Sequence, residues 1–304
     1  SSTGPLFRTF FPSTSPNRTI PQWSSIFNSS PNNPNNDVRE YLPFESRNLN
    51  FRFVVRDNHP GAGGASYSSL AMKVNDQSGP FKITFPNATS DRLFKNACNK
   101  IKWDVANTFN LPVNCKKVDI LLIRNRETNN PIILKTNTDN DGVELVDIPD
   151  LGTNVRVRVC VRAADHIFFD ISDRDITIVD ATTIGVNMGV VPNVLNVCLP
   201  QLAQVKIKSC SFGNYSGKLK LFIEAGLPQG TTYSFGKTEL SESDETDLSI
   251  DANNLLTKSN FTITVAAITS QGDTLRDELT INAIKNDFSD QQLIYPKNGE
   301  RNII

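Results

Sequence analysis

The feature that most constrains the fold of this chain is the strict alternation of apolar and polar residues in short segments. Residues 155–162 read VRVRVCVR, so valines occupy every second position, and three arginines and a cysteine occupy the others. Successive side chains of a β-strand point to opposite faces, and the pattern therefore predicts a strand with one face in a core. Residues 100–105 (KIKWDV) alternate in the same way, with Ile101, Trp103 and Val105 on the inward face.

Segments of this kind recur in two series, separated by turn residues. Seven short strands in about 100 residues is the spacing of an immunoglobulin-like β-sandwich. The first series is predicted at residues 81–85, 100–105, 118–123, 132–136, 143–148, 155–161 and 176–179. The second is predicted at residues 194–198, 205–208, 218–224, 232–235, 246–250, 261–268 and 274–284. Helical periodicity is nearly absent, so the sequence predicts an all-β chain of tandem immunoglobulin-like/fibronectin-like β-sandwich domains.

Two further strands are expected before the first series, at residues 49–55 and 67–74, and they follow an extended segment that is rich in Pro, Ser and Asn. The domain organisation that we expect is a partial sandwich with its extended N-terminal segment at 1–76, complete sandwiches at 79–181 and 187–285, and a linker into a further module at 286–304.

Composition excludes several classes of partner. The 304-residue chain has a formal net charge of −1, which offers no broad attraction for nucleic acid or an anionic membrane. No apolar run approaches the roughly 20 residues that span a bilayer. We therefore expect no nucleic-acid partner and no membrane span, and a partner of unknown identity that is a protein or a glycan.

Seven motifs follow one another in a specific order. They read LFRTFFPSTSPNRTIPQ, EYLPFESRNLNFRFVVRDNHPGAGGASY, GPFKITFPN, KIKWDVANT, PVNCKKVDILL, TNTDNDG and IFFDISDRDITI. In this order the chain resembles the accessory immunoglobulin-like region C-terminal to the catalytic domain of secreted bacterial reprolysin-like zinc metallopeptidases of the type IX secretion type. The resemblance implies secreted or cell-surface modules that act in spacing, adhesion or substrate positioning. The alternative is a structural or adhesive cell-surface protein with no protease domain.

The chain lacks the zinc-binding motif that such a peptidase needs. That motif, His-Glu-x-x-His, places two metal-binding histidines one helical turn apart, whereas the histidines here are His59, before Pro60, and His166, before Ile167. We therefore expect this chain not to be an enzyme. The resemblance also implies that earlier strands of the first sandwich lie elsewhere, so the chain is expected to be a fragment, a processed product or a recipient of donated strands.

Two interpretations remain for Asp57 and Asn58, which follow the first predicted strand. In the first, their oxygens bind Ca²⁺ between sandwich domains, and calcium is then the cofactor of the chain. Alternatively, the two side chains bond the loop backbone, and Gly61, Gly63 and Gly64 supply positive φ angles.

Two further acidic stretches are weaker calcium candidates. Asp170, Asp173 and Asp175 place three carboxylates within six residues, although solvated turn acids are the simpler interpretation. Residues 139–142 (DNDG) resemble the start of a calcium loop but lack its later ligands, so we interpret them as a hairpin turn.

Cysteines and basic residues complete the candidates. A secreted setting permits disulfides, and among five cysteines the pairs Cys98–Cys115 and Cys198–Cys210 are plausible, while Cys160 lies on the outward register. Five basic residues could form one face of a sheet. That face either binds a carboxylate or a sulfated glycan, or is simply solvated. The five residues are Lys100, Lys102, Arg156, Arg158 and Arg162.

Overall fold

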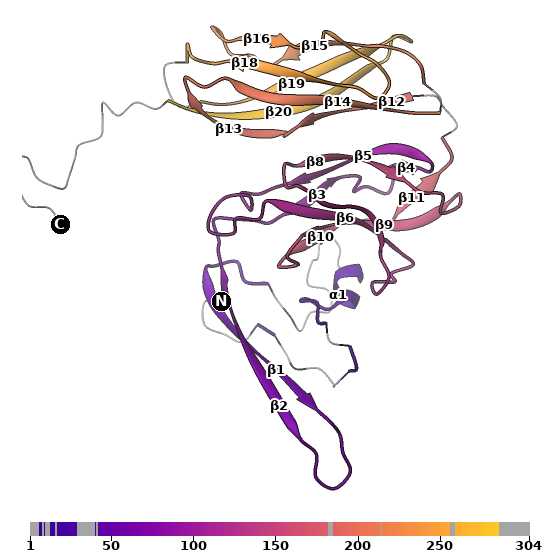
Figure 1. Ribbon diagram of the computed structural model, residues 1–304, viewed down its shortest axis with the longest axis vertical. Coiled ribbons are helices and arrows are strands. Elements are labelled where there is room, and N and C mark those ends of the chain that lie inside the picture. Colours follow the sequence, from indigo (N-terminus) through magenta and orange to yellow (C-terminus); the bar gives the residue numbers. More distant parts are fainter. Residues whose placement is uncertain are drawn as a thin grey trace, which may run out of the picture. The chain divides into compact units, whose positions relative to one another are not determined.

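A computed structural model shows the arrangement of the chain (Figure 1). It describes residues 6–7, 9, 13–15, 17–28, 40, 42–181, 185–213, 215–255 and 259–285. These residues form two compact units, which divide between Thr182 and Thr183. The boundary lies between the two complete sandwiches that the sequence predicts, and the predicted linker at 286–304 lies outside the described residues.

The first unit begins with a short helix and a two-stranded hairpin. Helix α1 spans Trp23–Asn28. Strands β1 (Arg47–Arg56) and β2 (Ala65–Val74) pair antiparallel through all ten residues without a bulge. No other described strand pairs with either of them. Whether the hairpin belongs to a separate incomplete domain at 1–76 stays a prediction.

The rest of the first unit is a β-sandwich. Its strands are β3 (Lys82–Phe85), β4 (Arg92–Phe94), β5 (Ala97–Asp104), β6 (Lys117–Arg124), β7 (Ile132–Asp139), β8 (Val143–Ile148), β9 (Val155–Ala163), β10 (Phe169–Ile171) and β11 (Ile176–Val179). One sheet has the order β3-β5-β8, and the other has the order β4-β11-β9-β6-β7, with β10 paired to β9.

The second unit repeats this topology. Its strands are β12 (Gly185–Val191), β13 (Val194–Leu199), β14 (Ala203–Phe212), β15 (Leu219–Ala225), β16 (Thr232–Phe235), β17 (Glu239–Leu240), β18 (Glu245–Asp251), β19 (Ser259–Thr269) and β20 (Thr274–Lys285). The sheets have the orders β12-β14-β18-β16 and β13-β20-β19-β15-β17. In both sandwiches the second strand runs parallel to the last one, β4 beside β11 and β13 beside β20. Both units therefore contain immunoglobulin-like sandwiches, and the predicted fold class is confirmed.

Alternate residues of each strand fill the space between the sheets, as the pattern predicts. In β5, Ile101 and Trp103 are fully buried, while Lys100 and Lys102 are only partly buried. In β9, Val157, Val159 and Val161 enter the same core. A sandwich of this size buries enough apolar area to be stable because both sheets contribute one whole face.

Five elements were not predicted. Strands β4, β10 and β17 have only two or three residues, which is too short for a periodic signal. Helix α1 has six residues, also too few for helical periodicity. Strand β12 contains two glycines, which weaken strand propensity and conceal the alternation.

Asn140 joins the core of the first sandwich to the turn before β8. It is 1% exposed. Its Oδ1 accepts a hydrogen bond from Trp103 Nε1 at 2.9 Å, and its Nδ2 donates to the backbone oxygen of Cys115 and to Thr108 Oγ1, both at 3.0 Å. The amide is therefore the polar partner that allows the indole of Trp103 to be buried.

Replacing this amide is expected to destabilise the chain. In Asn140→Ala the buried indole N–H and the carbonyl of Cys115 lose their partner, which costs about 3 kcal/mol of unfolding free energy. Urea denaturation followed by tryptophan fluorescence measures the loss. Asn130→Ala, at an exposed position, is the matched control and should change stability by less than about 0.5 kcal/mol. Equal stabilities of the two variants would contradict the role of Asn140.

Candidate binding surfaces

Asp57 closes the loop between β1 and β2. Its Oδ1 accepts hydrogen bonds from the backbone N–H groups of His59 at 3.1 Å and Gly64 at 2.9 Å. These two N–H groups hold the pKa of the Asp57 carboxyl below its usual value, because they stabilise the carboxylate. A Cβ atom at Gly63 or Gly64 would lie only 3.2 or 3.1 Å from the carboxylate oxygens. The loop therefore packs closely around this side chain.

This geometry is the structural alternative that the sequence leaves open. Asn58 and Gly61 have positive φ angles of 54° and 92°. Gly63 and Gly64 do not, so the prediction for these two is wrong, and they are required for close approach instead. Among the described residues, no group of three or more His, Cys, Asp or Glu side chains is arranged to hold a metal ion. Calcium binding at Asp57 and Asn58 stays a prediction.

The carboxylate of Asp170 holds two sheets of the first sandwich together. Its Oδ2 accepts a hydrogen bond from the backbone N–H of Ile83 at 2.7 Å, which joins β10 to β3. Burial disfavours the charged form and raises the pKa of Asp170 to about 6.

Asp173 and Asp175 point to other partners. Asp173 Oδ2 accepts a hydrogen bond from Asn87 Nδ2 at 2.9 Å, and Asp175 Oδ1 lies 2.6 Å from Arg158 Nε. The three carboxylates of the predicted weaker calcium site are thus engaged separately, each in a contact that ties the segment around β10 to its neighbours. The structure does not bring them together into one set of ligands.

The turn at residues 139–142 crosses between sheets. It joins β7, which pairs with β6, to β8, which pairs with β5. The predicted hairpin is therefore wrong, because the two strands belong to opposite sheets. Burial raises the pKa of Asp141 to about 7, and the nearby carboxylates of Glu144 and Asp139 add to the effect.

The predicted basic sheet face does not exist as one surface. Lys100 and Lys102 lie on β5, in a different sheet from β9 and its arginines. Arg158 and Arg162 form ion pairs with Asp175 and with Asp119, the latter at 3.0 Å. Opposite carboxylates thus neutralise two of the three arginines.

Helix α1 covers part of the sheet that contains β6 and β9. Phe27 packs against Leu121, Ile123, Cys160 and Ile171 on the outer side of the sheet. Cys160 therefore lies on the outward register, as predicted, and is nevertheless buried.

Both predicted disulfide pairs are wrong. Cys115 is a buried free thiol in the core, whereas Cys98 lies on the outward register of β5. Cys198 is an exposed free thiol on β13 and therefore does not pair with Cys210 of β14. Cys98 and Cys210 are disulfide-bonded, and Cys160 is free.

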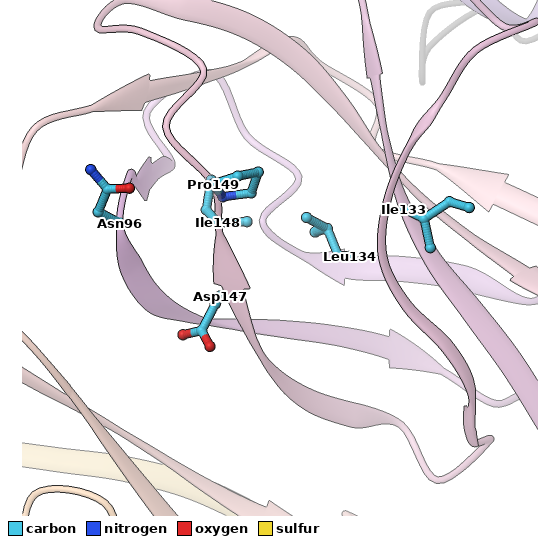
Figure 2. A pocket seen from close by; sticks show the side chains of 6 residues that line it. All are labelled: Asn96, Ile133, Leu134, Asp147, Ile148 and Pro149. Atoms are coloured by element: carbon cyan, nitrogen blue, oxygen red, sulfur yellow. The ribbon is translucent and has the colours of Figure 1, made fainter.

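A groove opens between the two sheets of the first sandwich at β7 and β8. It has a volume of about 540 Å³ and is lined by Asn96, Ile133, Leu134, Asp147, Ile148 and Pro149. Figure 2 shows these side chains spread over β7, the end of β8 and the turn before β5. Lys135 and Glu144 join β7 to β8 through an ion pair of 2.9 Å. Four apolar side chains, one amide and one carboxylate line the groove, so both polar and apolar groups face it.

The second candidate surface is the hairpin, which has one apolar face. The register places Leu49, Phe51, Phe53 and Val55 of β1 on the same side as Leu70 and Met72 of β2. Arg47, Ser66 and Ser68 lie on this side as well. Phe53, Val55 and Leu70 are 53%, 54% and 59% exposed. The sequence predicted both strands but not their exposure, because alternation is typical of a strand that is covered on one face.

The comparisons with known proteins leave the chain without an assigned family. No protein-family model matches it. No curated protein matches it either. The longest described helix has six residues, and none of those described could span a bilayer.

Three solved structures with some likeness to this chain are distant from it. The periplasmic chaperone SfaE is 17% identical with a TM-score of 0.28, over 34% of this chain and 58% of SfaE. The BIgI domain of the β protein of S. agalactiae, bound to CEACAM1, is 13% identical with a TM-score of 0.25, over 34% of this chain and 100% of that domain. Fibronectin(III)-like modules of Clostridium thermocellum CbhA are 8% identical with a TM-score of 0.23, over 67% of this chain and 94% of the modules. None of them assigns an activity, a ligand or a partner to this chain.

The thiols are expected to react in a defined order. Cys198 is exposed and should react with a thiol reagent in the native chain. Burial raises the pKa of Cys115, and raises that of Cys160 to about 12, so these two should react only after unfolding. Titration with dithiobis-nitrobenzoate should therefore find three thiols in guanidinium chloride and five after reduction. Five thiols before reduction would contradict the structure.

Stability is expected to depend on pH through Asp141. Its folded pKa, raised to about 7, exceeds the unfolded value of about 3.9, so its contribution is full below pH 4 and is lost as the pH rises through 7. Asp141→Asn should therefore raise the unfolding free energy at pH 8 by on the order of 2 kcal/mol. The gain should shrink towards pH 4, as measured by urea denaturation. The same change at exposed Asp165 is the control, and a gain of equal size at both pH values would refute the assignment.

Proposed function

We propose that this chain is a non-catalytic, extracellular part of a larger protein, in which rigid sandwiches space and present binding surfaces. The observation that carries the proposal is the hairpin, whose apolar side chains Phe53, Val55 and Leu70 are exposed. Exposed apolar patches of this kind are typical of interaction sites. The carboxylates that are candidates for a metal site make internal contacts instead, as Asp57 does in its loop.

Two observations support the extracellular setting. Cys98 and Cys210 are disulfide-bonded, and disulfides persist mainly in oxidising compartments. The ordered motifs from LFRTFFPSTSPNRTIPQ to IFFDISDRDITI resemble a secreted protein, although no family model matches the chain.

We propose a reprolysin-like zinc metallopeptidase, secreted by the type IX pathway, as the parent protein. The chain would then serve in spacing, adhesion or substrate positioning for a catalytic domain elsewhere in that protein. The ordered motifs are the observation that favours it. A structural or adhesive surface protein without a protease domain is the second candidate, favoured by the same exposed hairpin. An encoded His-Glu-x-x-His motif upstream of this region in the gene distinguishes the two.

The purified chain is expected to have no peptidase activity of its own. Incubation with casein and with a quenched fluorescent peptide, in the presence of Zn²⁺ and separately with a chelator, should give equal background rates. A zinc metallopeptidase added to the same substrates is the positive control. Cleavage that follows the chain through purification and stops with the chelator would overturn the proposal, because it would require a zinc site that includes this chain.

A further inference from the structure

Strand β1 could accept another strand because it has an edge without a neighbouring strand, an apolar face and a face with cationic residues. Its outer edge is unpaired among the described residues, because β1 and β2 form a two-stranded sheet. A two-stranded hairpin is marginally stable in water, whereas three strands with an apolar face can be independently stable. In an antiparallel pair alternate residues exchange backbone hydrogen bonds, so a ten-residue edge offers roughly five such residues. Within the part of the chain that the structure describes, no strand lies beside β1 on this edge from Asn48 to Arg56.

The two faces of β1 differ in chemistry. Phe53 and Val55 project to the apolar face. Arg52 and Arg56 project to the other face, where Arg52 lies over the ring of Tyr67 at 4.5 Å. Lys73 of β2 projects to this same face. Neither strand contains an Asp or a Glu, so every charged side chain on this face is cationic. Val54 and Tyr67 share the face with them, and Arg47 lies on the opposite side of β1.

These two faces indicate which side chains would fit in a strand that pairs with the outer edge of β1. A strand beside β1 continues both faces of the sheet, so its side chains lie next to those of β1 at distances of about 5 Å. Apolar residues fit beside Phe53 and Val55. Aspartate or glutamate fits beside Arg52 and Arg56, because cross-strand pairs of opposite charge are favourable and like charges directly opposite are not.

Packing of two hairpins face to face is the competing possibility. The four exposed apolar side chains of this face are Phe53, Val55, Leu70 and Met72, and the exposed hydroxyls of Ser66 and Ser68 interrupt them. The ring of Phe7 already lies 5.5 Å from that of Phe51 and covers part of this face. The apolar contact between two such faces is therefore interrupted, which favours pairing along the edge of β1 over packing of the faces.

We propose that the outer edge of β1 binds an extended strand of another protein, in which apolar residues alternate with acidic ones. Binding would occur by β-strand addition, with affinity from backbone hydrogen bonds and specificity from the alternating side chains. This inference rests on the binding role proposed above and names the chemical class of the partner.

The test uses the full 304-residue chain and two synthetic probes. One is a fluorescein-labelled decapeptide that alternates valine with glutamate, and the other alternates valine with lysine. Fluorescence anisotropy at low salt should show saturable binding of the glutamate peptide, at least about tenfold tighter than the lysine peptide. Hydrogen–deuterium exchange should slow in residues 48–56 when the glutamate peptide binds.

Charge-reversal variants test the specificity. Arg52→Glu combined with Arg56→Glu should reverse the preference, so that the lysine peptide binds more tightly. Lys73→Glu is the matched control, because Lys73 lies on the same face but on β2, and it should retain the preference for the glutamate peptide. Circular dichroism checks that each variant folds. If the double variant does not fold, Arg56→Glu alone replaces it. This single variant should reduce the ratio of the affinities for the glutamate and lysine peptides.

Three results would overturn the docking site. They are the absence of saturable binding up to about 1 mM peptide, equal affinity for both peptides, and protection at β7 and β8 in place of β1. A chain that sediments as a dimer with protected residues 48–56 would also overturn it in favour of a second copy. None of these results depends on the peptidase assay, so failure of this site is distinguishable from failure of the proposed function.

Discussion

The packing of one sheet against another is the constraint on which both sandwiches depend. Each strand must present apolar side chains to the inner face only, and the hydrogen-bonded ladders must satisfy the backbone while the inner faces interdigitate. In the first sandwich this places Trp103 in the centre, where its indole N–H needs the amide of Asn140. The second unit is built in the same way, with β13 beside β20 as β4 lies beside β11. The constraint leaves the edges and outer faces of the sheets for other contacts.

Most polar side chains that are candidates for a metal or binding site form contacts that hold the fold together. Asp57 binds loop amides, Asp170 joins β10 to β3, and Arg158 is paired with Asp175. These contacts satisfy buried or turn-bound groups that would otherwise be costly. Function is then a property of surfaces, and two such surfaces stand out among the described residues. They are the groove between β7 and β8 and the hairpin whose apolar face is exposed. The hairpin has the more specific chemistry, because Phe53 and Val55 lie on one face of β1 and Arg52 and Arg56 lie on the other.

Much of the fold could be predicted from periodicity because the signal is local. The strands at 143–148, 176–179 and 232–235 have the predicted bounds, and Ile101 and Trp103 point inward as expected. Predictions failed where the answer required knowledge of which sheet a strand joins. The DNDG turn connects opposite sheets, Lys100 and Arg156 lie in different sheets, and Cys198 and Cys210 are near in sequence but in opposite sheets. Of the candidate surfaces, only the two strands of the hairpin were predicted, since the groove is built by residues from separate parts of the chain.

The sequence by itself determined the class of the fold, the positions of most strands and the face that each strand buries, because an alternating pattern acts on nearest neighbours. It also predicted the two strands of the hairpin, at residues 49–55 and 67–74. Only the tertiary structure decided that helix α1 buries Cys160, that the acidic residues around β10 have separate partners, and that the apolar side of β1 and β2 is exposed. The physical reason is that burial and pairing depend on contacts with residues that are distant in the sequence, and no local pattern specifies which residues make these contacts.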